Sequence, residues 1–333
     1  MKAASAKKQA SKTLTITIPA YNIQDYLDRS LTSITKQEII DELDIIIVND
    51  GSKDKTLDIA KKYQEKYPNS IRVIDKENGG HGSVINTAMA LAKGKYFRVL
   101  DGDDWFSDAT VLAYLKELKK ADEDLILTNY SYVYVQQNKK ELIDVYEKVK
   151  NIKKVSGLSD LEISDHDLIL TLAIHSCTIK TEQLQKVWGA GLLEKVFYED
   201  QEFVSKIILA ADSMRAYDMD VYQYMIGRDE QTMSRDKMFK HRQDHASVLS
   251  QLVEMSVNCS DQKKRSLLLR RAREIYKTHY WIYFYHPGLT RREKAEFKKF
   301  KANISKLDPE ISQKVNIKFK LQLFLGRHRA MLK

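Results

Sequence analysis

The sequence predicts an α/β fold with a mainly parallel central sheet flanked by helices, followed by a C-terminal helical extension. Strand and helix patterns alternate through the first 130 residues, as in sheets built from strand–helix–strand units. The continuous apolar run in Asp44–Val48 is typical of a strand that is buried on both faces. With 333 residues, 43% of them hydrophobic, the chain can bury a large core.

The predicted strands and helices follow one another in a regular order. The strands are Thr13–Ile18, Asp44–Val48, Ile71–Ile74, Lys95–Leu100 and Leu125–Tyr130. The helices are Asp25–Lys36, Asp54–Tyr67, Ser83–Lys93 and Thr110–Lys120. We expect Pro19 to end the first strand, because proline cannot donate to a ladder. We expect Gly94 to end the third helix in the C′ position.

The second half of the chain has a weaker pattern that becomes helical toward the end. Val133–Ser156 predicts a hairpin or an irregular connection, Glu199–Ala211 a helix, and Arg215–Tyr224 one or two short strands. Three further helices are predicted at Ser247–Val257, Lys264–Phe284 and Arg291–Ile304. Thr290 and Glu293 form a capping-box signature before the last of these. We therefore expect a disordered N-terminus over residues 1–12, a main domain over 13–235 and a basic helical region over 236–333.

Net charge and cysteine content restrict the partners and the compartment. The chain carries a formal charge of +9, with lysine and arginine crowded at 263–273, 291–306 and 314–333. Such surfaces attract anionic membranes or phosphorylated substrates, although a solvated basic face that binds nothing is an open alternative. No nucleic-acid-binding motif is present, so no nucleic acid partner is expected.

Two cysteines far apart and no long apolar run predict a cytoplasmic protein, with peripheral contact at the inner face of the cell membrane as a further expectation.

The aromatic run Trp281–Tyr285 follows a basic helical stretch and has two interpretations. It could sit at a lipid interface with neighbouring cations on anionic head groups. Core packing of the helical extension is the favoured alternative.

An acidic cluster at Leu100–Trp105 directly follows the fourth predicted strand. It places Asp101, Asp103 and Asp104 within four residues, where their charges repel one another unless a cation lies among them. A divalent cation with oxygen ligands, Mn²⁺ or Mg²⁺, meets that requirement. The alternative is a solvated acidic turn before the next helix, which Asp108 could cap.

Polar residues gather where each of the first four predicted strands ends. They are Tyr21 and Asn22, then 49–52, then 78–80, and finally the acidic cluster. Ligands of such sheets bind at the carboxyl ends of the strands. The four clusters together therefore predict one binding site at that edge.

Five short motifs in register resemble the family 2 glycosyltransferases with the GT-A fold. They are Ile18–Asn22, Val48–Ser52, Glu77–Gly80, Ala92–Tyr96 and the acidic cluster, and the resemblance covers roughly residues 13 to 232. It implies a nucleotide-binding site made by Pro19, Tyr21, Asn22, Asp50, Gly80, Asp101 and Gly102. In this set Tyr21 would pack on the base and Asp50 would accept a hydrogen bond from it. The resemblance also implies that Asp103 is the metal ligand, with Asp101 and Asp104 secondary.

Further along the chain, Tyr198–Phe203 resembles the acidic motif that supplies the catalytic base of this family, here Asp200. A base of this kind works best with a pKa raised by burial or by acidic neighbours. A helix N-terminus stabilised by its dipole is the structural alternative for Glu199 and Asp200.

One departure from the family pattern concerns a cationic contact to the donor. Ile85 stands where the family often has arginine. His81 is a candidate substitute, with an ordinary loop residue as the alternative. Arg228 is a second candidate, in a segment where relatives carry a mobile loop near the diphosphate, and a solvated loop arginine is its alternative.

These observations predict an inverting, metal-dependent glycosyltransferase of cell-surface polysaccharide synthesis, transferring a hexosyl or N-acetylhexosaminyl group. It would move a sugar from a nucleotide-sugar donor, UDP-linked by expectation, to a hydroxyl of a glycan or lipid-linked acceptor. A non-catalytic subunit that binds sugar nucleotides or partners remains an alternative because of Ile85. A sugar nucleotidyltransferase is disfavoured, because residues 19–22 lack a glycine-rich, basic triphosphate loop.

Overall fold

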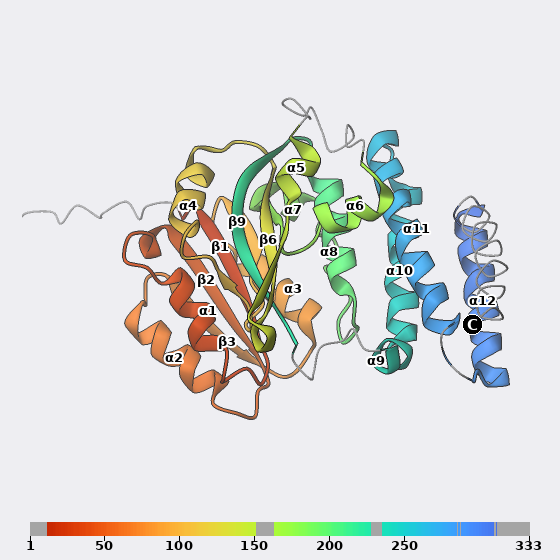
Figure 1. Ribbon diagram of the computed structural model, residues 1–333, viewed down its shortest axis with the longest axis horizontal. Coiled ribbons are helices and arrows are strands. Elements are labelled where there is room, and N and C mark those ends of the chain that lie inside the picture. Colours follow the sequence, from red (N-terminus) through yellow and green to blue (C-terminus); the bar gives the residue numbers. More distant parts are fainter. Residues whose placement is uncertain are drawn as a thin grey trace, which may run out of the picture.

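The computed structural model describes residues 12–150, 163–227, 235–284, 286, 288–309 and 311, and within this part the predicted α/β fold is confirmed (Figure 1). A nine-stranded sheet runs in the order β3-β2-β1-β4-β8-β6-β9-β5, and β7 pairs with β6. Neighbouring strands from β3 to β4 are parallel, β8 is antiparallel to both of its neighbours, and β6 and β9 are parallel. The sheet is therefore mixed but mostly parallel.

The strands have the following bounds. They are β1 Leu14–Ala20, β2 Leu43–Asp50, β3 Ile71–Lys76, β4 Tyr96–Val99, β5 Trp105–Phe106, β6 Leu125–Tyr134, β7 Lys139–Ile143, β8 Cys177–Lys180 and β9 Met214–Ile226. Every residue of β2 is buried, as its apolar run predicts. The hairpin expected after Val133 is formed by β6 and β7.

The helices flank this sheet and continue beyond it. They are α1 Leu27–Ile34, α2 Thr56–Lys66, α3 His81–Leu91, α4 Val111–Lys120, α5 Val145–Val149, α6 Asp165–Thr171, α7 Thr181–Lys186, α8 Glu199–Ala210, α9 Arg235–Lys240, α10 Arg242–Asn258, α11 Gln262–Phe284 and α12 Arg291–Leu307. Short 3₁₀ turns lie at Ile40–Glu42 and Val135–Gln137.

Two expected element ends were wrong. Strand β1 continues through Pro19 to Ala20, because β4 pairs with β1 only as far as Thr17 opposite Val99. The missing N–H of Pro19 therefore leaves no ladder bond unmade. Helix α3 ends at Leu91, and Gly94 is needed for another reason: a Cβ there would lie 2.3 Å from the backbone nitrogen of Thr15 in β1.

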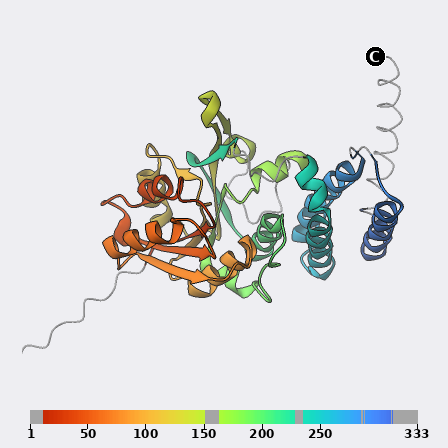
Figure 2. The ribbon, with the colours of Figure 1, turned by 90° about the horizontal axis from the view of Figure 1, so that it is seen from below.

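Helices α10, α11 and α12 form a separate group on the side of α8, away from α1 and α2 (Figure 2). They share a second hydrophobic core, and the capping box of Thr290 and Glu293 is present at the start of α12. Leu267 and Leu268 of α11 join the main core, so the extension is packed onto the α/β part. Ile282 and Tyr283 are buried, which fits core packing of the aromatic run.

Other sequence expectations fall partly outside the described residues. Of the N-terminal stretch, only Lys12 is described, and its ammonium donates to the carbonyl of Asp41 at 3.0 Å. Arg228 and the tail after residue 311 also lie outside. Among the described helices, none combines the length and the apolar character needed to cross a membrane.

Candidate active site

The acidic cluster forms a tight turn after β4, held by groups from β9. The backbone N–H of Asp104 donates to the carbonyl of Asp101 at 2.9 Å. The hydroxyl of Tyr222 donates to the Asp104 carboxylate at 2.6 Å and accepts from the N–H of Asp101 at 3.1 Å. The N–H of Met225 donates to the other carboxylate oxygen of Asp104 at 2.7 Å. Gly102 fits because a Cβ would lie 2.1 Å from Ile23 and 2.7 Å from the carbonyl oxygen of Pro19.

The three carboxylates of this turn differ in burial and charge. Burial and the nearby charges of Asp103 and Asp101 raise the pKa of Asp104 well above its ordinary value. Arg29 places a positive charge against the turn. Its guanidinium donates to the carbonyl of Asp103 at 2.8 Å and lies 3.8 Å from the centre of the Trp105 ring. A cation bound at the turn would favour the ionised form of Asp104 and so offset the cost of burying that carboxylate.

Asp101, Asp104 and His175 converge into a group with metal-ligand spacing. One ligand atom from each lies within 4.8 Å of the others. The ring of His175 stacks between Tyr222 and Tyr224, with ring centres 4.9 and 4.4 Å away. Burial lowers the pKa of His175 to about 4, so the ring is neutral, and its buried Nδ1 has no hydrogen-bond partner among the described residues.

This donor set fits a divalent cation. Two carboxylates and one imidazole suit Mn²⁺, whereas Mg²⁺ prefers oxygen ligands alone. The assignment of Asp103 as the principal ligand remains a prediction, because the group that converges contains Asp101 and Asp104 instead.

His81, at the start of α3, connects this turn to α8. Its Nε2 lies 2.8 Å from Asp101 Oδ1, and its Nδ1 lies 2.6 Å from a carboxylate oxygen of Glu199. Burial alone would lower the pKa of His81, but Glu199 and Asp101 outweigh it and raise that pKa well above its ordinary value. The ring is therefore an imidazolium, and it holds positive charge between two carboxylates.

Asp200 lies beside Glu199 in the first turn of α8. Burial and the charge of Glu199 raise the pKa of Asp200 to about 6, although Arg271 acts in the opposite direction. Gln201 donates to its Oδ2 at 2.7 Å. At neutral pH the carboxylate is mostly ionised and basic enough to accept a proton from a hydroxyl.

Residues predicted to bind the nucleotide surround the ends of β1 and β2. Tyr21 is 51% exposed, as a residue that stacks on a base requires. Asn22 accepts from the N–H of Lys53 at 2.8 Å and so orders the next loop. Asp50 is buried and accepts from the backbone N–H groups of Gly79 and Gly80, each at 2.8 Å. The structure thus gives Asp50 a role in ordering the glycine loop, and its bond to a base stays a prediction.

Position 85, where the family often has arginine, lies in the core of this protein. Ile85 is fully buried in the main core, so its side chain offers nothing to a ligand. The imidazolium of His81 is the described cation that lies against the acidic turn from α3.

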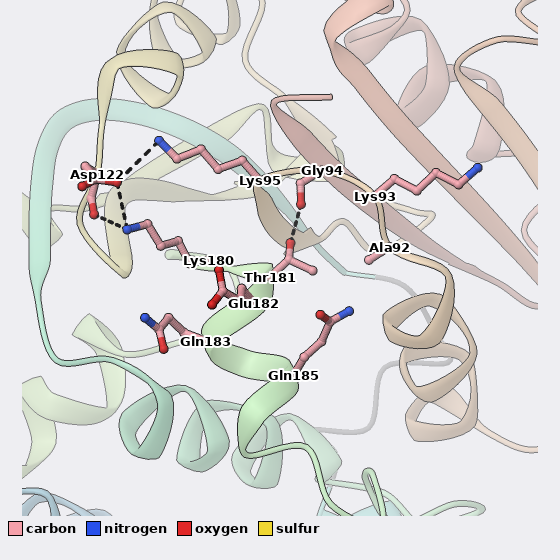
Figure 3. Close-up of a pocket in the computed structure, with 10 residues that line it drawn as sticks. All are labelled: Ala92, Lys93, Gly94, Lys95, Asp122, Lys180, Thr181, Glu182, Gln183 and Gln185. Atoms are coloured by element: carbon pink, nitrogen blue, oxygen red, sulfur yellow. Dashed lines mark hydrogen bonds and ion pairs between the residues drawn. The ribbon is translucent and has the colours of Figure 1, made fainter. Parts of the chain in front are cut away.

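A hollow of about 440 Å³ lies at the opposite end of β4 (Figure 3). Gly94 and Lys95 precede β4, whereas the acidic turn follows it. In the hollow Lys180 pairs with Asp122 at 3.0 Å, and Thr181 donates to the carbonyl of Gly94 at 2.7 Å. The hollow is therefore separate from the candidate active site.

Sequence reasoning missed His175, Tyr222, Gln201 and Arg271 as contributors to the site. His175 precedes β8, whose direction is opposite to that of the parallel strands, so its beginning lies at the active edge. Tyr222 falls within a strand that the sequence did predict. Only the alternation along that strand could have indicated an inward position.

The order of the sheet, the polar strand ends and the C-terminal helices define an α/β fold of the GT-A type. Residues 15–175 match the profile described as "Glycosyl transferase family 2", which assigns this segment of the chain to that family.

Known relatives agree with this membership. The minor teichoic acid biosynthesis protein GgaB of Bacillus subtilis is 38% identical over 117 residues, which are 34% of this chain and 13% of that protein. The poly(ribitol-phosphate) beta-glucosyltransferase of Bacillus spizizenii is 29% identical over 233 residues, which are 66% of this chain and 33% of that protein. The chain thus matches a third or less of the length of either relative.

A solved structure shows the same fold over most of the chain. TarS 1–349 of S. aureus in complex with UDP superimposes with a TM-score of 0.67 at 19% identity, covering 91% of this chain and 83% of that one. Its complex with UDP-GlcNAc gives a TM-score of 0.66 at 18% identity, with the same coverage.

Proposed function

We propose that this chain transfers a sugar from a UDP-linked donor to a hydroxyl of a teichoic-acid-like or other cell-surface polymer, with inversion at the anomeric carbon. One observation carries the proposal: His81 connects the acidic turn after β4 to Glu199, the residue that precedes Asp200 at the start of α8. This contact supports the proposal that the site for the departing diphosphate and the base for the acceptor belong to one network.

The chemistry follows from these positions. The acceptor oxygen forms a bond to the anomeric carbon while the bond from that carbon to the diphosphate oxygen breaks. Asp200 takes the hydroxyl proton, and the electron pair leaves with the diphosphate. A divalent cation held by the acidic turn would neutralise the charge that develops on this leaving group. The His81 imidazolium adds a fixed positive charge on the same side.

The donor base and the acceptor class are supported by the relatives. UDP and UDP-GlcNAc are named in the TarS complexes, and polymers of the teichoic acid kind are named for GgaB and the poly(ribitol-phosphate) enzyme. The exposed face of α12 carries Arg291, Arg292, Lys294, Lys298 and Lys299. Such a face suits a polyanionic acceptor or an anionic membrane surface.

The test begins with thermal denaturation of the full chain with UDP-, GDP- and dTDP-sugars, with and without Mn²⁺. A ligand that binds the native state raises the melting temperature, so the donor class and the metal requirement are read together. We expect the largest shift with a UDP-sugar plus Mn²⁺, followed by slow release of UDP. Asp200→Asn should abolish turnover and keep donor binding; full turnover by this variant would refute the assignment of the base.

Membrane contact is tested separately by sedimentation with phosphatidylglycerol vesicles. Binding that disappears at high salt supports an anionic surface as a partner. Absence of binding, or equal binding to neutral vesicles, would leave the polymer as the partner of this face.

A further inference from the structure

Arg271 of α11 is a charged side chain buried at the junction between the helical extension and α8. It is 1% exposed. Burying a guanidinium is costly unless its N–H groups find partners. Its Nη1 donates to the carbonyl of Leu172 at 2.9 Å, and its Nη2 donates to the side-chain oxygen of Gln201 at 2.7 Å. Its Nε has no hydrogen-bond partner among the described residues.

The contact with Gln201 fixes the orientation of that amide. A guanidinium carries donors alone, so the amide oxygen must face Arg271. The amide nitrogen then faces Asp200 and donates to Oδ2 at 2.7 Å. Arg271, Gln201 and Asp200 therefore form a directed chain of hydrogen bonds from the extension to the candidate base.

We propose that Arg271 is a positioning residue for Asp200, acting through Gln201, so that the C-terminal helices complete the catalytic machinery. This inference rests on the proposed role of Asp200 as the base. It assigns the extension a part in the chemistry, in addition to any contact with acceptor or membrane.

Electrostatics support the geometry. The groups that act on Asp200 from the surrounding elements are Glu199 on its own helix, His81 of α3 and Arg271 of α11, while Tyr198 precedes it in the chain. Glu199 raises the pKa of Asp200, and both cations lower it. Arg271 remains charged at neutral pH, because burial lowers its pKa to about 10 only. Its removal should therefore make Asp200 harder to ionise.

The test is the pH profile of UDP release from UDP-GlcNAc, or from whichever UDP-sugar gives the largest thermal shift, by the full chain with Mn²⁺. In Arg271→Met the acid limb should move up by about one pH unit, so the rate falls about tenfold at pH 5.5 and less than twofold at pH 8.5. Arg271→Lys should shift the limb less, because it keeps the charge and loses the planar fork. Arg270→Met, a neighbour that pairs with Asp165 at 2.7 Å, should leave the limb unchanged.

A second variant guards against loss of folding in Arg271→Met. Gln201→Met keeps the buried cation and removes the donor to Asp200, so kcat should fall while the KM for the donor stays constant. An equal loss of rate at every pH in Arg271→Met, or an unchanged kcat in Gln201→Met, would overturn the inference. Full turnover by Asp200→Asn would instead refute the proposed function, so the two failures are distinguishable.

Discussion

Asparagine at position 200 should make the fold more stable while it removes catalysis. The pKa of Asp200 is about 6 in the folded chain, against an ordinary value of 3.8, chiefly through burial. A carboxyl with a raised pKa holds its proton more tightly when folded, so stability falls as the pH rises from about 4 to 6. About two units of pKa correspond to a cost of about 3 kcal/mol above pH 6. Asparagine avoids this cost and still offers an oxygen to Gln201.

Urea denaturation followed by circular dichroism measures the effect. We expect Asp200→Asn to raise the free energy of unfolding by about 3 kcal/mol at pH 8 and by about 1 kcal/mol at pH 4.5, where the folded wild type is already protonated. Asp108→Asn is the matched control, because its side chain is 79% exposed. Equal destabilisation of Asp200→Asn at both pH values would refute the claim that burial of the charged carboxylate is costly.

Three further predictions concern the network, the turn and the metal. His81→Gln should slow UDP release at least tenfold, because the positive charge between Asp101 and Glu199 is lost. His166→Gln, at an exposed position, is the control. An unchanged rate in His81→Gln would refute a role for His81 in joining these two carboxylates. Gly102→Ala should lower stability by about 1–3 kcal/mol through overcrowding, measured by urea denaturation, whereas Gly288→Ala should be neutral because its Cβ meets nothing within 4 Å. His175→Phe should weaken Mn²⁺ binding measured by calorimetry in the presence of UDP, and an unaltered Kd would remove His175 from the ligand set.

Much of the first half of the fold could be predicted because local and tertiary signals agree there. The apolar runs that become β1, β2 and β4 are bounded by polar or turn-forming residues, and each polar cluster lies at a strand end. This pattern was enough to predict which edge of the sheet carries the candidate site. Strand β8 was missed because it has only four residues and these mix polar and apolar side chains. Pairing with a neighbouring strand on each side, rather than composition, makes it a strand.

Buried charged side chains were the hardest feature to predict, because charged residues usually lie at the surface. Arg271 lies in a basic run that reads as a solvated face, yet it is buried. Arg98 is also fully buried and donates to Thr178, Thr128 and the carbonyl of His175. No local pattern distinguishes such a residue from an exposed one, because its partners are far away in sequence.

The inverted strand β8 has a consequence for how the protein is made. It lies between β4 and β6, so these two strands cannot be joined until residue 180 has been synthesised, and the sheet is complete only once β9 has been made up to residue 226. The first hundred residues carry most of the recognisable motifs, yet a nascent chain of that length lacks Tyr222 and His175. The acidic turn that directly follows would emerge from the ribosome without the aromatic groups that later hold it, so nucleotide affinity should arise late in translation.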